Sequence, residues 1–385
     1  MSPFAADNGS GSTITTLEKL RHINWGLLLV ISAIAGIGFA MLYSAANGST
    51  EPWMSRQAGR FAVGLCALVA VALVDFRIWL RYAYPLYALA FVLLIYVDVA
   101  GQVGMGAQRW ITVGFFQLQP SEMMKICLIL ALARYFHGFS YEEIGRPLNI
   151  VPPIVMVLAP AGLVLIQPDL GTAGMLILGG ALMFFVAGVR LWKFAIVAIA
   201  GLSAIPIGWN FLRDYQKDRV LTFLNPESDP LGAGYHIMQS KIAFGSGGLF
   251  GKGFLQGSQS HLSFLPERQT DFIFTMLAEE FGMVGGLILL GLYALLIAYG
   301  LAIGLRSRNQ FGRLLAIGLT GNLFLYVFIN TAMVMGLVPV VGVPLPLISY
   351  GGTAMIAVLV GFGLVMSVYI NRDIRIGRRG GVGDD

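Results

Sequence analysis

The sequence predicts an all-α membrane protein, a polytopic bundle of about ten transmembrane helices with a large extracytoplasmic loop between the seventh and eighth. Hydrophobic residues make up 57% of the 385 residues and the mean hydropathy is +0.76, which excludes an ordinary soluble domain. Apolar runs of about 17 to 25 residues recur along the chain, and each can cross a hydrocarbon core of about 30 Å. Charged residues are only 12% of the chain and concentrate in one insert, residues 210–271.

The apolar runs divide the chain into a membrane domain, residues 21–372, and two short tails. Residues 1–20 are polar and rich in Gly and Ser, so we expect a disordered cytoplasmic tail, and residues 373–385 form a basic, Gly-rich tail. The first apolar run is too long for a signal peptide and lacks a convincing cleavage site. The predicted spans are 25–43, 59–75, 83–99, 121–136, 150–166, 172–189, 191–209, 273–304, 314–336 and 349–370.

The basic residues predict the orientation of the chain. With ten spans both termini lie on one side, and that side collects fifteen of the 25 Lys and Arg residues. Because cytoplasmic loops attract Lys and Arg, both termini are predicted to be cytoplasmic and the insert to be outside. The net charge of +5 therefore indicates topology and a basic tail near anionic membrane lipids, and we expect no nucleic acid as a partner.

Four further segments are predicted to meet the insert on the outer side: 55–60, 106–125, 167–172 and 338–352. Residues 111–119 have partly alternating polarity, which fits either a segment at the membrane interface or one that re-enters the membrane. Residues 338–352 are too rich in Pro and Gly for a plain helix. At membrane depth such backbone is tolerated only when it is buried in protein or lines a wet cavity.

Several familiar catalytic patterns are absent. The Gly-rich run 245–253 fails as a phosphate-binding loop, because Ser246 replaces its first Gly and Gly253 replaces its Ser or Thr. We therefore expect a tight external loop there. The histidines lack zinc spacing, no G-x-S-x-G occurs, and Cys66 and Cys127 lie in apolar runs.

Carboxylates near the outer membrane surface are the remaining candidates for chemistry. Asp271 lies where the polar insert becomes an apolar helix, and two interpretations stay open: a general base whose pKa burial raises, or a carboxylate that stabilises a helix N-terminus. Glu279 and Glu280 lie roughly 12 Å deeper, at 1.5 Å per residue. We expect them to face the bundle interior, as a functional or structural pair.

The other polar residues in or near predicted spans have structural alternatives. Glu122 and Lys125 are three residues apart on one helix face and predict an ion pair. Asp169 suits a turn or a helix cap as well as a site. Two arginines, Arg56 and Arg109, have side chains that match phosphate oxygens. Polar amides within the ninth span predict interhelical hydrogen bonds; they are Asn322 and Asn330.

Five sequence blocks together resemble one known family. They are GAQRW, QPSEMMK, QPDLGT, the run from NPESDPLGAGYH to LPERQTDFIF, and PLPLISYGG. They resemble the SEDS proteins (shape, elongation, division and sporulation), polytopic peptidoglycan glycosyltransferases of the plasma, or inner, membrane. The resemblance covers about residues 20 to 372, and the insert looks more like that of the elongation members than that of the division members.

The resemblance implies a catalytic residue and a set of binding residues. Asp271 falls on the catalytic carboxylate of the family. Residues implied to bind substrate or pyrophosphate are Arg56, Arg109, Glu122, Lys125, Asp169, Gln216, Arg219 and Lys241. The implied substrate is lipid II, an undecaprenyl-pyrophosphate-linked disaccharide-pentapeptide, and the implied partner is a class B penicillin-binding transpeptidase. No cofactor is required, and a divalent cation (Mg²⁺ or Mn²⁺) is compatible with the chemistry.

Two other function classes compete with this interpretation. A lipid II flippase or transporter also has about ten spans with charges inside the membrane, although no inverted repeats are evident and the polar residues crowd the outer end instead of the midplane. A non-catalytic scaffold for a penicillin-binding protein is the third class. Only the enzyme needs Asp271 as an inverting general base.

Overall fold

The computed structural model describes residues 16–104, 107–113, 116–211, 217, 221–225, 233–258, 268–374 and 377. Within them a long helix lies at each of the ten predicted places, so the membrane-spanning helical bundle is confirmed. Eight of these helices are long and apolar enough to cross a membrane. The other two are α5, which carries three charged residues, and α9, whose apolar stretch is Leu191–Ala204. The ten are α2 (Trp25–Ala45), α3 (Met54–Leu73), α4 (Phe76–Ala100), α5 (Pro120–His137), α7 (Pro147–Ile166), α8 (Leu170–Ala187), α9 (Leu191–Phe211), α13 (Ile273–Arg306), α14 (Gln310–Val334) and α15 (Gly352–Ile370).

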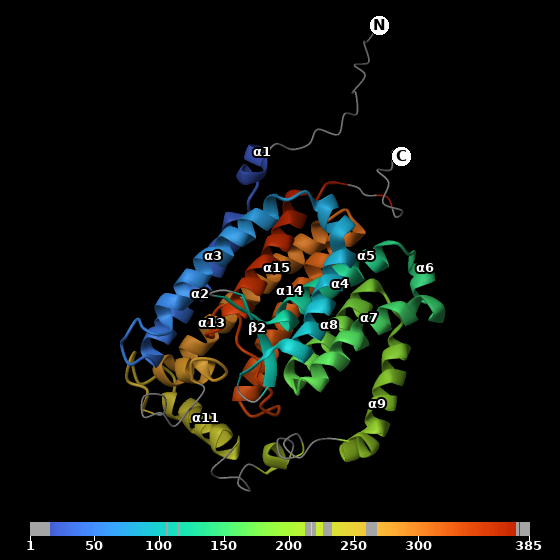
Figure 1. Ribbon diagram of the computed structural model, residues 1–385. Helices are drawn as coiled ribbons and strands as arrows, with labels where there is room; N and C mark the ends of the chain where they lie inside the picture. The colour runs from blue at the N-terminus through green and yellow to red at the C-terminus, as the bar shows by residue number, and fades with distance from the viewer. Residues whose placement is uncertain are drawn as a thin grey trace.

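The helices pack around α14 and α15, which are the most buried of the apolar spans (Figure 1). Helix α14 contacts α5, α8, α13 and α15, and α15 packs along α3. Helix α9 stands at the edge of the bundle, with most of its apolar side chains exposed. The short α1 (Thr16–Arg21) and the C-terminal end of α15 lie at one end, whereas α11 (Ala233–Gly247) lies at the other.

A small three-stranded antiparallel sheet adds strand structure to the predicted all-α fold. Its strands are β1 (Gln102–Gly104), β2 (Ala107–Val113) and β3 (Phe116–Leu118), in the order β1-β2-β3, between α4 and α5. The alternating polarity of residues 111–119 is therefore a strand pattern, because side chains alternate between the faces of a strand. The hydroxyl of Thr353 donates to the carbonyl of Gln117 (2.7 Å), which ties the sheet to the start of α15.

Helix α13 is broken, and the Gly-rich run fills the break. Gly282 is buried and has φ 66° and ψ −162°, so it interrupts the helix and frees backbone groups that need other partners. Residues 248–253 supply the missing partners, so this tight loop packs into a helix. The bonds are Lys252 N–H to Glu279 O (3.0 Å), Gly253 N–H to Glu280 O (3.0 Å), Met283 N–H to Gly248 O (3.0 Å) and Val284 N–H to Leu249 O (3.1 Å).

Replacing Gly251 with alanine tests whether residues 248–253 stabilise the break in α13. Gly251 has φ +81°, and a Cβ there would lie 2.1 Å from the carbonyl oxygen of Glu280. Strain of about 1–3 kcal/mol, with weakened hydrogen bonds of about 1 kcal/mol each, should lower the thermal unfolding midpoint in detergent by several degrees. Gly245→Ala is the control, since nothing lies near its Cβ position and alanine favours a helix. Equal thermal unfolding midpoints for the two variants would contradict the packing of residues 248–253 into the break in α13.

Candidate active site beside an amphipathic cavity

Asp271 lies two residues before the start of α13. Phe272 is the N-cap residue and makes no side-chain cap bond, so Asp271 precedes the cap. The Asp271 side chain is half-buried. The amide of Asn330 donates to the carbonyl of Asp271 (3.0 Å) and to that of Val343 (2.8 Å). The predicted hydrogen-bonding role of Asn330 is thus confirmed, but its partners are the two segments beside Asp271.

The backbone ahead of Asp271 is held by the Pro- and Gly-rich segment 338–352. Tyr350 N–H donates to the carbonyl of Gln269 (2.8 Å), and the Ser349 hydroxyl donates to that of Thr270 (2.6 Å). Gln57 of α3, fully buried, donates its amide to the Ser349 carbonyl (2.9 Å). Helix α3 begins at Met54, earlier than predicted, because hydropathy cannot detect a helical turn whose polar side chain is buried in protein.

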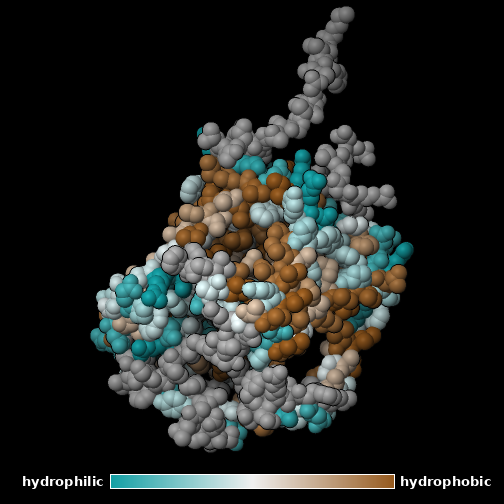
Figure 2. All heavy atoms as spheres, viewed as in Figure 1, coloured by the Kyte–Doolittle hydropathy of each residue, from teal (hydrophilic) through white to brown (hydrophobic). Residues whose placement is uncertain are grey.

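A cavity of about 1090 Å³ adjoins this segment. Its polar end is lined by Arg56, Arg60, Thr270 and Tyr350, and Thr270 directly precedes Asp271. The surface between α3 and α4 is hollowed and lined by hydrophobic residues (Figure 2). The apolar walls come from α4, α5 and α15, and include Leu86, Ile126, Ile356, Val360 and Leu364. Such an amphipathic shape accommodates a polar group joined to a long hydrocarbon chain.

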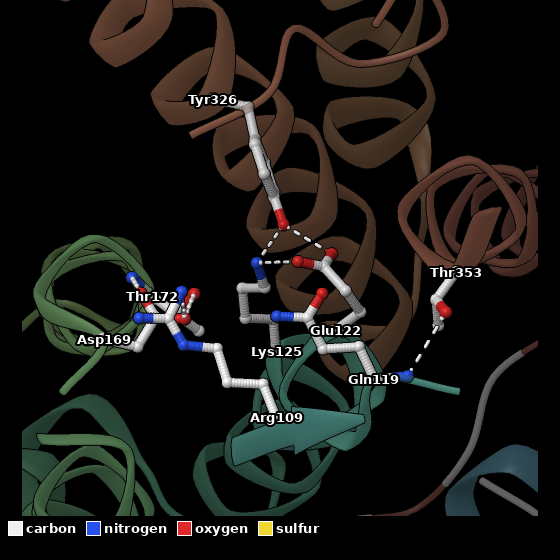
Figure 3. Close-up of polar contacts among 8 residues, drawn as sticks. All are labelled: Arg109, Gln119, Glu122, Lys125, Asp169, Thr172, Tyr326 and Thr353. Atoms are coloured by element: carbon white, nitrogen blue, oxygen red, sulfur yellow. Dashed lines mark hydrogen bonds and ion pairs between the residues drawn. The ribbon is translucent and has the colours of Figure 1, made fainter. Parts of the chain in front are cut away.

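The predicted ion pair of Glu122 and Lys125 is confirmed (Figure 3). The ammonium of Lys125 lies 2.7 Å from Oε1 of Glu122, and the Tyr326 hydroxyl donates to Oε2 of the same carboxylate (2.7 Å). Lys125 also contacts the Tyr326 hydroxyl, and all three side chains are buried. Tyr326 is absent from the sequence-based prediction, because a tyrosine in an apolar run gives no sign of which charge it meets.

Arg109 of β2 pairs with Asp169, as Figure 3 shows. Their closest atoms are 3.4 Å apart, and Arg109 also donates to the carbonyl of Pro168 (2.8 Å). Asp169 accepts from Thr172 N–H (3.0 Å) and from the Thr172 hydroxyl (2.9 Å). The expected cap role of Asp169, at the start of α8, is therefore confirmed, and the same carboxylate positions the sheet.

The two deep glutamates, Glu279 and Glu280, are fully buried, as expected. Lys252 lies 2.8 Å from Glu279, and the Ser44 hydroxyl lies 2.5 Å from Glu280. The first contact fastens residues 248–253 to α13, and the second joins α2 to α13. Their role is structural in this arrangement.

Three predicted binding residues belong to the insert. Lys241 is exposed on α11, whereas Gln216 and Arg219 lie outside the described residues. The structure brings Arg56 to the cavity beside Asp271, and it adds Arg60, which the sequence prediction missed although its spacing of four from Arg56 places both on one helix face. Within the described ranges, there is no group of three or more His, Cys, Asp or Glu side chains that could hold a metal ion.

These features define a polytopic membrane protein with a polar site at one end of the bundle, open to an apolar channel. A family profile described as cell cycle protein, FtsW/RodA/SpoVE, matches residues 20–374. The chain belongs to this family, which is the SEDS family, and the predicted resemblance is confirmed.

Named relatives cover nearly the whole chain. Peptidoglycan glycosyltransferase MrdB of Escherichia coli K12 is 47% identical over 353 residues, 91% of this chain and 94% of that protein. Peptidoglycan glycosyltransferase RodA of Treponema pallidum is 33% identical, covering 91% of this chain and 98% of that one. Stage V sporulation protein E of Bacillus subtilis is 35% identical, covering 89% and 95%.

Solved structures share the fold. A chain of a peptidoglycan synthase complex, described as coordinating polymerization and crosslinking, has a TM-score of 0.79 at 35% identity. The rod shape determining protein RodA of Thermus thermophilus has a TM-score of 0.70 at 33% identity. In both comparisons 91% of this chain and 98% of the other chain are covered.

Glu122→Gln should destabilise the protein, because it leaves the buried ammonium of Lys125 without its charged partner. Breaking a buried pair from one side costs about 3–5 kcal/mol, so we expect a clear fall in the thermal unfolding midpoint in detergent. Adding Lys125→Met should recover much of that loss, as double-mutant analysis would measure. Glu142→Gln, at an exposed carboxylate, is the matched control. Additive losses in the double variant would contradict the pairing.

Proposed function

We propose that this chain polymerises lipid II into glycan strands at the outer leaflet of the plasma membrane during cell elongation, with Asp271 as the general base. The chain is a peptidoglycan glycosyltransferase of the SEDS type, like its named relatives in E. coli and T. pallidum. One observation carries the assignment of the base: Asp271 directly follows Thr270, which lines the polar end of an amphipathic cavity. Together with the family resemblance, that position supports the mechanism proposed below.

The proposed reaction is a single displacement. Asp271 takes the proton of the acceptor sugar 4-hydroxyl, and the resulting oxygen forms a bond to the anomeric carbon of the donor. The bond between that carbon and the pyrophosphate oxygen breaks, and undecaprenyl pyrophosphate leaves with the electron pair. Attack opposite the leaving group inverts the anomeric centre. One carboxylate is enough, because the pyrophosphate needs its charge neutralised and does not need a proton.

Charge neutralisation is assigned chiefly to Arg56. Among the described residues Arg56 has no acidic partner, and it lines the cavity. Arg109 and Lys125 are each paired with a carboxylate, so we assign them to holding the outer ends of β2 and α5 in place around the substrate. Lys241, Gln216 and Arg219 are proposed as additional substrate contacts from the insert. A divalent cation bridging the pyrophosphate would supply further positive charge.

The proposed setting follows the charge distribution and the comparisons. Both termini are assigned to the cytoplasm and α11 to the outer side. This agrees with the positions of α1 and the C-terminal end of α15 at one end of the bundle in Figure 1 and of α11 at the other. A class B penicillin-binding transpeptidase is the proposed partner, supported by the likeness to a chain of a complex that combines polymerization with crosslinking.

Asp271→Asn should lower the rate of glycan polymerisation by about 10²–10⁴-fold, the usual contribution of a general base. The assay is incubation of the purified protein with lipid II, with products separated on a gel. The thermal unfolding midpoint should stay at the wild-type value, because the substitution keeps the hydrogen bond that the backbone carbonyl of residue 271 accepts from Asn330. Asp98→Asn, at an exposed carboxylate near the end of α4, is the control and should polymerise normally.

The result also separates the function classes. Near-normal polymerisation by the Asp271→Asn protein would refute the assignment of the base. Unchanged lipid II with the wild-type protein would favour a transporter or a scaffold. Normal cell elongation supported by Asp271→Asn would favour the scaffold.

A further inference from the structure

Two arginines that have no acidic partner in the described part of the chain line the polar end of the cavity. Arg56 and Arg60 are four residues apart on α3, which places them on one face of the helix, and both line the cavity. Neither forms a salt bridge with any described residue. Arg60 is half-buried and Arg56 is exposed. Like charges at this spacing repel each other, and an anion bound beside both side chains would relieve that repulsion.

Arg60 is held in place by the segment that also fixes the backbone before Asp271. Its guanidinium carbon lies 4.7 Å from the ring centroid of Tyr350. A Cβ added at Gly352 would be 3.2 Å from Cζ and Nε of Arg60, so the absence of a side chain at Gly352 makes room for the guanidinium. Nη1 of Arg60 is buried and has no hydrogen-bond partner among the described residues. A buried, oriented donor of this kind lacks an acceptor that a ligand can supply.

The N-terminus of α15 faces the same space. Gly351, Gly352 and Thr353 line the cavity, and the N-cap residue Gly351 has no side chain with which to cap the helix. The first N–H groups of a helix have no partner within the helix, and the helix dipole makes this end positive. Together with the two guanidinium groups, this end of α15 presents several N–H donors and two full positive charges to one small region.

The walls below these groups are apolar over several helical turns. Ile356, Val360 and Leu364 follow one another at intervals of four residues along α15, and the far end is lined by Leu130 of α5 and Trp79 of α4. The ligand that fits has an anionic head and a long hydrocarbon tail. A diphosphate offers two phosphoryl groups to two guanidinium forks, whereas a monophosphate offers one.

We propose that Arg60, together with Arg56 and the first turn of α15, forms a site that selects a diphosphate over a monophosphate on a polyprenyl chain. The proposal rests on the proposed function, because it concerns the group that leaves the donor sugar. Arg60 is here a specificity-determining residue. It contacts the phosphate farther from the polyprenyl chain, which the monophosphate lacks.

Equilibrium binding without turnover tests the site. Affinities of the purified full-length protein are measured in detergent for farnesyl diphosphate, farnesyl monophosphate and inorganic pyrophosphate. We expect the wild-type protein to prefer the diphosphate by about 10- to 100-fold, the usual range for hydrogen bonds to a charged group. Arg60→Gln should abolish most of that preference while leaving the affinity for the monophosphate within about twofold. Arg77→Gln, which removes an exposed positive charge of α4, should retain it.

A second variant keeps the test decisive. Arg60→Lys retains the charge but loses the planar fork, so its preference should fall between those of the wild-type and Arg60→Gln proteins. An unchanged preference in either folded Arg60 variant would overturn the proposal. An equal loss of affinity for both farnesyl ligands would also overturn it, because that pattern indicates a structural role.

Inorganic pyrophosphate identifies the source of the anion. We expect it to bind much more weakly than farnesyl diphosphate; equal affinities would show a site for free phosphates and overturn the polyprenyl assignment. The binding preference does not depend on the general base. If Asp271→Asn polymerises normally, the assignment of the base fails but the diphosphate preference can still hold. If the Arg60 variants keep the wild-type preference while Asp271→Asn loses polymerisation, the diphosphate site fails and the assignment of the base stands.

Discussion

The requirement that every buried backbone group find a partner governs this structure. A bilayer core holds no water that could satisfy a broken helix, yet the chain interrupts its helical bundle where it places its polar site. At Gly282 the break in α13 is filled by residues 248–253, which exchange four backbone hydrogen bonds with it. At the start of α13, Tyr350 and Ser349 satisfy the carbonyls of Gln269 and Thr270. The backbone before Asp271 is thus held by segment 338–352, and the break further along α13 is held by residues 248–253.

Side-chain charges follow the same rule with one informative exception. Glu122, Lys125 and Tyr326 form a buried triad, Asp169 holds Arg109, and Glu279 holds Lys252. These pairs hold the N-terminal parts of α5, α8 and α13 in place, at the desolvation cost that buried ions carry. The exception is the pair Arg56 and Arg60 of α3, which lines the cavity and has no carboxylate partner among the residues that the structure describes. Two positive charges that have no acidic partner among the described residues thus lie where an anionic substrate would enter.

Much of this arrangement could be predicted from the sequence, and the limits have physical causes. Length and hydropathy were sufficient for the ten helices, and helical spacing was sufficient for the pair of Glu122 and Lys125. Asp271 needed the family resemblance, because one carboxylate at a helix start has the same local pattern whether it caps or catalyses. Tyr326 and Gln57 escaped prediction, since their partners, Glu122 and Ser349, are about 200 residues or more away and a single sequence carries no sign of that proximity. The small sheet was missed because two of its three strands have only three residues.

The hollow between α3 and α4 joins a polar head region to walls as apolar as the lipid around them (Figure 2). A polyprenyl chain that enters sideways through this opening never has to pass through water, so hydrophobic desolvation adds little to its capture. The effective supply of such a substrate is then its mole fraction within one leaflet, and not its amount per volume of solution. The degree of saturation of the enzyme then depends on the composition of the membrane. Diluting the substrate with other lipids lowers it, whereas diluting the membranes with buffer does not.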